Sequence, residues 1–110
     1  MIPTLLLALS PVAWSPASPA ADAAAGQRTY NASCMACHGS NADGKGPAAA
    51  ALKPQPTDFT SAAFWKDRDD GSVKRVIKAG KPGTAMMAFG QLSDGDLDDL
   101  VAFLRAKAPK

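Results

Sequence analysis

Five consecutive residues of this chain carry side chains with a specific chemistry: Cys34-Met35-Ala36-Cys37-His38. The spacing C-x-x-C-H is the signature of covalent, c-type haem attachment. The thiols of Cys34 and Cys37 are spaced to form thioethers with the two vinyl groups of one haem. His38 then falls beneath the iron as its proximal ligand. The motif occurs once, so we expect one covalent haem c.

The cysteine pair has two interpretations other than haem attachment. In an exported protein, two cysteines can form a disulfide or a redox-active dithiol. A zinc site is the second alternative, but zinc usually takes four protein ligands, or three in a catalytic site. His38 is the only histidine of the chain. The histidine directly after the second cysteine favours haem over both.

The sixth iron ligand must come from another part of the sequence. The chain has no second histidine, so a second histidine ligand would have to come from another chain, and methionine is the next expectation for an electron carrier. Met1 lies in the predicted leader, and Met35 lies on the proximal side between the two tethered cysteines. Met86 and Met87 remain. Methionine is also a common gap filler in cores, but a loop with Gly and Pro favours a ligand role here.

The first residues resemble a secretory signal peptide. Residues 1–20 contain no charged side chain, include the run Leu5-Leu6-Leu7-Ala8-Leu9, and end in small residues. A membrane anchor is the alternative, but Pro11 and Pro16 interrupt a run shorter than the ~20 apolar residues that a spanning helix needs. We therefore expect residues 1–21 to be cleaved and residues 22–110 to form one domain. Export also fits the haem motif, because bacteria attach haem c outside the cytoplasm, in the periplasm.

The charge balance gives no indication of a nucleic-acid or membrane partner. The formal net charge is +2, and two ionised haem propionates would bring it close to zero. There is no basic excess of the kind that binds nucleic acid or anionic lipid.

The hydrophobic periodicity predicts an all-α domain without strands. The last helix, after the N-cap Ser93, has the clearest apolar stripe, formed by Leu97, Leu100, Val101 and Leu104. The other expected segments are a helix over 22–36 capped by Asp22, short helical pieces over 48–52 and 57–65, a helix over 73–79 capped by Ser72, and an irregular loop over 81–91.

Together these features resemble class I c-type cytochromes, the small monohaem carriers of bacterial periplasms. The matching features are Gly26 with Tyr30 on the first helix, C-x-x-C-H followed by Gly39, Gly46-Pro47, the methionine loop 83–90, and the helix after Ser93. The resemblance covers nearly all of the expected mature chain. It implies a cytochrome c-like fold, with three to five short helices around one covalent haem and with the first and last helices crossing.

The resemblance also implies roles for individual residues. Proline usually follows the axial methionine in this family, so the alignment makes Met86 the ligand and puts Met87 at the proline position, with Met87 as the alternative ligand. The carbonyl of Pro47 would accept the Nδ1 proton of His38. The indole of Trp65 would donate to a haem propionate, unless Trp65 is a simple core residue.

The function implied is non-enzymatic electron transfer by iron cycling between its ferrous and ferric states. The expected partners are redox proteins, an electron donor and an electron acceptor, and the protein would act as a monomeric shuttle. Two alternatives remain: an electron-entry subunit of a larger oxidoreductase, and a peroxidase-like or gas-sensing haem with a labile methionine. The absence of a second histidine, a natural distal acid–base group, counts against the catalytic alternative.

Overall fold

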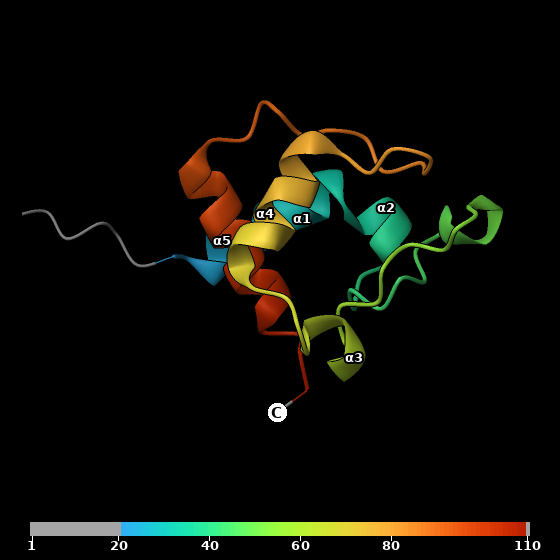
Figure 1. Cartoon of the computed structure of the whole chain (residues 1–110), viewed down its shortest axis with the longest axis horizontal. Coiled ribbons are helices and arrows are strands. Elements are labelled where there is room, and N and C mark those ends of the chain that lie inside the picture. Colours follow the sequence, from blue (N-terminus) through green and yellow to red (C-terminus); the bar gives the residue numbers. More distant parts are fainter. Residues whose placement is uncertain (1–20, 110) are drawn as a thin grey trace, which may run out of the picture.

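The fold is centred on two crossed helices from opposite ends of the chain. The computed structural model of the protein describes residues 21–109, and in it α1 (Ala23–Ser33) crosses α5 (Asp94–Arg105) (Figure 1). The two backbones approach so closely that a Cβ added to Gly26 would lie 2.0 Å from the carbonyl oxygen of Asp99. The backbone N–H of Asp22 also donates to Asp99 Oδ1 at 2.7 Å. The predicted all-α cytochrome c-like fold and the predicted crossing are confirmed, and the described residues contain no strand.

The N-caps of α1 and α5 are those expected from the sequence. The side chain of Asp22 accepts hydrogen bonds from the first backbone N–H groups of α1, and Ser93 and Asp96 form a reciprocal capping box at the start of α5. Helix α4 (Asp70–Ala79) begins three residues before the predicted start. Its cap is Asp69, whose Oδ1 accepts from the backbone N–H of Ser72 at 2.8 Å, so Ser72 was wrongly predicted to be the cap.

The predicted first helix, 22–36, is divided at the haem motif. Helix α1 ends at Ser33, Cys34 adopts φ −120° and ψ −28°, and α2 (Met35–His38) follows as a separate turn. The backbone N–H of His38 donates to the Cys34 carbonyl at 2.9 Å, so the two residues lie one helical turn apart. Gly39 ends α2 with φ +87°, a value that glycine adopts without strain. The haem motif therefore begins beyond the end of α1, and its last four residues form α2.

The middle of the chain is mostly irregular. The expected piece over 48–52 is a 3₁₀ turn, η1 (Ala49–Ala51), and the expected helix over 57–65 is confined to α3 (Ala62–Trp65). Residues 81–91 contain no helix, as predicted. The chain between α2 and α4 therefore acts as a long loop with two short helical turns.

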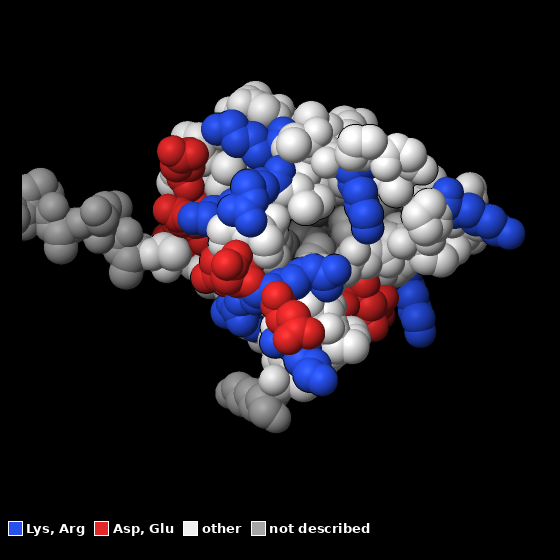
Figure 2. Space-filling model, viewed as in Figure 1, with Lys and Arg blue, Asp and Glu red and all other residues white. Residues whose placement is uncertain are grey.

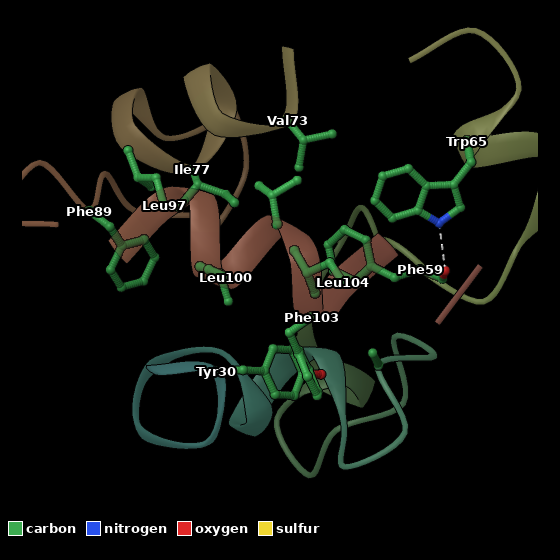
Figure 3. Close-up of a cluster of buried hydrophobic side chains, with 12 residues drawn as sticks. Tyr30, Phe59, Trp65, Val73, Ile77, Phe89, Leu97, Leu100, Phe103 and Leu104 are labelled. Atoms are coloured by element: carbon green, nitrogen blue, oxygen red, sulfur yellow. Dashed lines mark hydrogen bonds between the residues drawn. The ribbon is translucent and has the colours of Figure 1, made fainter. Parts of the chain in front are cut away.

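The core lies where α4 and α1 pack against α5 (Figure 3). All four residues of the predicted α5 stripe are at most 2% exposed. Phe103, on the same helix, packs on the ring of Tyr30 with ring centres 5.0 Å apart. The hydroxyl of Tyr30 donates to the carbonyl of Gly39, which ties the end of the haem motif to this core.

The predicted signal peptide lies outside the described residues, apart from Ala21. Between residues 21 and 109, no helix combines the length and the apolar character that crossing a membrane requires.

We predict that Gly26→Ala lowers the free energy of unfolding by about 1–3 kcal/mol, because the new methyl group would overlap backbone atoms of α5. Urea denaturation of the haem-loaded protein measures the effect. Gly95→Ala is the matched control, since the atom nearest to its Cβ is Ser93 Oγ at 3.8 Å. Equal stability of the two variants would contradict the close crossing.

Candidate haem-binding site

A cavity of about 490 Å³ opens beside α2, within the usual size range of small-molecule sites, ~300–1,000 Å³. Figure 2 shows it as a hollow near the centre of the face, with Lys and Arg side chains on its border. Its walls come from α2, α4, the segment 52–59 and the methionine loop. The apolar wall of α4 is formed by Val73, Val76 and Ile77. The cavity therefore offers an apolar slot beside the haem motif.

Both cysteines and the histidine of the motif line this cavity. Cys34 and Cys37 are half-buried and form no disulfide with each other. Burial, and to a lesser degree the charge of the neighbouring Cys37, raise the pKa of the Cys34 thiol to about 11. Two thiols and an imidazole on one wall are the groups needed to attach a haem covalently and to coordinate its iron.

The imidazole of His38 is held by a backbone carbonyl. Its Nδ1 lies 3.1 Å from the carbonyl oxygen of Thr57, and its ring packs on Phe59 with centres 4.9 Å apart. Because a carbonyl can only accept, Nδ1 carries the hydrogen and Nε2 keeps a lone pair. Burial lowers the pKa of His38, outweighing the hydrogen bond to Thr57, which raises it. The ring is thus positioned as a neutral ligand.

The predicted partner of His38, the carbonyl of Pro47, is wrong. Pro47 is exposed and does not line the cavity. Its neighbours bond to the backbone of α2: Gly46 N–H donates to the carbonyl of Cys37 at 3.1 Å, and Ala48 N–H to that of Ala36 at 2.9 Å. These bonds hold the Gly-Pro segment along α2, while the extended stretch at Thr57 approaches the imidazole.

The two candidate methionines lie on the same loop but differ in exposure. Both line the cavity; Met86 is half-buried and packs against the core, whereas Met87 is 67% exposed. A hydrogen bond from Lys81 N–H to the Met86 carbonyl, 3.1 Å, closes the loop. Within it, Gly83 turns the chain with φ +80°. Of the two side chains, that of Met86 is the better restrained.

Trp65 does not line the cavity, and its indole N–H has another partner than the predicted haem propionate. Its indole N–H donates to the carbonyl of Phe59 at 2.8 Å, and the side chain is 8% exposed (Figure 3). The guanidinium of Arg105 covers the ring, 4.5 Å from its centre. Its surroundings match the alternative interpretation, a core tryptophan. The single N–H donor of the indole is already bonded to the carbonyl of Phe59.

Four residues that line the cavity were not assigned to it from the sequence. The carbonyl of Thr57 left no trace there, because any residue type presents a carbonyl. Phe59 and Phe64, edge to face with ring centres 5.2 Å apart, were visible only as apolar residues of a predicted helix. Arg68 also lines the cavity; its position depends on the turn between α3 and α4.

Comparison with known proteins identifies the class to which this fold and site belong. Residues 21–104 match the family described as cytochrome C oxidase, cbb3-type, subunit III. The chain therefore belongs to the cytochrome c family, which implies haem c as its cofactor and haem-based electron transfer as its activity.

Two known proteins resemble the chain, one in sequence and one in fold. Cytochrome c-554(547) of Halothiobacillus neapolitanus is 40% identical over 89 residues, which span 77% of this chain and 96% of that protein. A chain of the Kuenenia stuttgartiensis reducing HAO-like protein complex shares the fold, with a TM-score of 0.71 and 22% identity. The match covers 82% of this chain but only 44% of that longer chain.

We predict that Trp65→Phe destabilises the protein by about 1–3 kcal/mol, because the buried carbonyl of Phe59 loses its donor. The midpoint potential should not change, since the indole does not reach the cavity. Denaturant unfolding and a redox titration measure the two effects. A shifted potential with unchanged stability would restore the propionate role of Trp65.

Proposed function

We propose that this protein is a periplasmic one-electron carrier with a single covalent haem c ligated by His38 and Met86. The observation that carries the proposal is that one cavity is lined by both cysteines of the motif, by His38 and by Met86. Cys34 and Cys37 would hold the haem through thioethers. Bound there, haem supplies an iron that cycles between the ferrous and ferric states.

The chain itself prepares the proximal ligand. Thr57 holds the proton on Nδ1 of His38, which leaves Nε2 for the iron and raises the basicity of the ring. Phe59 packs on the imidazole and restricts its rotation. His38 is thereby oriented before the haem is in place.

The distal ligand is better assigned to Met86 than to Met87. Met86 is partly buried against the core and its backbone is fixed by Lys81 and Thr84, whose Oγ1 accepts from Met86 N–H at 3.2 Å. A thioether ligand favours ferrous iron. The apolar residues of α4 line the slot, and an apolar surrounding disfavours the additional charge of a ferric centre.

The location and the mature form belong to the same proposal. Residues 1–21 would be removed as a signal peptide, leaving the domain 22–110 in the periplasm. The support is the uncharged, apolar character of residues 1–20 and the extracytoplasmic site of haem c attachment.

A fixed electron-entry subunit of a larger oxidoreductase is the second candidate. It is favoured by the family description, which names an oxidase subunit, and by the structural relative, which belongs to a protein complex. Purification from its native source at natural abundance separates the two. A free monomer with reversible one-electron titration supports the shuttle; constant co-purification with one enzyme supports the subunit.

Replacing each loop methionine tests the coordination. We expect Met86→Ala to abolish the weak red absorbance of the ferric iron–thioether bond and to lower the midpoint potential. Met87→Ala, the matched control one residue away, should retain both. The reverse pattern would assign the ligand to Met87, and a five-coordinate, high-spin iron in the unaltered protein would favour a catalytic or sensing haem.

A further inference from the structure

The side chains that line the cavity are unbalanced in charge. Among the described residues that line it, none is acidic, and only Arg68 and Lys81 carry a positive charge. A haem brings two carboxylates into its site, and a carboxylate removed from water is costly unless it is paired. The cavity therefore has a charge complementary to the group that the proposed function assigns to it, and the inference below rests on that function.

The two cations lie beyond opposite ends of α4. Arg68 precedes α4 and Lys81 follows it, and a ten-residue helix is about 15 Å long. The propionates of a haem share one edge, opposite the edge that carries the vinyl groups. Because Cys34 and Cys37 would tether the vinyl edge, the cation that meets the propionates must belong to a wall away from the motif.

Arg68 has the geometry for this role. Its guanidinium lies 4.3 Å from the centre of the Phe64 ring, and Nη1 donates to the Phe64 carbonyl at 2.9 Å. Arg105 Nη2 in turn donates to the Arg68 carbonyl at 3.2 Å, which restrains the backbone between α3 and α4. The side chain is thus held in one place before any ligand arrives.

The remaining donors of Arg68 are available. Within the described residues, three ion pairs connect α4 with α5: Lys74–Asp98, Lys78–Asp94 and Arg105–Asp70. Arg68 takes part in none of them. A planar guanidinium with free donors matches a carboxylate in two parallel hydrogen bonds. Lys81, by contrast, belongs to the methionine loop, where its backbone N–H is bonded to Met86.

We propose that Arg68 binds a haem propionate, the role that the family resemblance suggested for Trp65. A cation beside the propionate offsets a negative charge that would otherwise stabilise ferric iron. Arg68 therefore raises the midpoint potential as well as fixing the edge of the haem.

Redox titration of charge variants tests the proposal. We expect Arg68→Gln to lower the midpoint potential. Arg68→Lys, which keeps the positive charge, should retain most of the original potential. Arg75→Gln is the matched control, because Arg75 is exposed like Arg68 and carries the same charge but does not line the cavity. An unchanged potential in Arg68→Gln, or an equal shift in Arg75→Gln, would overturn the assignment.

A second measurement needs no variant. In the diamagnetic ferrous protein, proton NMR should show cross-relaxation between the Arg68 side chain and the methylene protons of a propionate. Its absence, or its appearance at Lys81, would contradict the proposal even if Arg68→Gln failed to fold. A protein without covalent haem would instead refute the proposed function, so the two failures can be told apart.

Discussion

The close crossing of α1 and α5 is the contact on which the haem site depends. Only a glycine at position 26 allows the two backbones to meet, since any side chain would overlap the carbonyl of Asp99. The crossing buries Tyr30 against Phe103, and the Tyr30 hydroxyl reaches the carbonyl of Gly39, next to His38. The packing of α1 on α5 therefore anchors the backbone at the end of the haem motif, whereas Thr57 and Phe59 orient the ring of His38.

The other walls are held by shorter-range bonds. The backbone N–H groups of Gly46 and Ala48 bond their loop to α2. The Thr57 carbonyl accepts from the imidazole of His38, and the indole of Trp65 donates to the carbonyl of Phe59. These interactions leave an apolar slot within the described residues 21–109, and in a chain of this size a single core is a marginal source of stability. Haem in that slot would add apolar contact where the chain has little of its own, so binding and folding are expected to support each other.

The sequence predicts the structure best where a feature depends on side-chain types at a fixed spacing. The haem motif, the stripe of α5 and the capping box at Ser93 each depend on side-chain type at a fixed spacing, and the fold they implied is confirmed. The errors have a common origin in backbone geometry. The partner of His38 is a carbonyl that any residue can offer, the donor of Trp65 is taken by another carbonyl, and the cap of α4 moved from Ser72 to Asp69, an equally good capping residue. The position of Arg68 likewise follows from a turn that composition does not encode.

The central claim is that Met86 and His38 close the coordination of one haem attached at Cys34 and Cys37. Proton NMR of the reduced protein tests it most directly, because a methionine bound to haem iron lies over the ring and its methyl resonance is displaced far upfield by the ring current. The account predicts one such methyl group, assigned to Met86. A spectrum without a displaced methionine methyl, or one assigned to Met87, would contradict it.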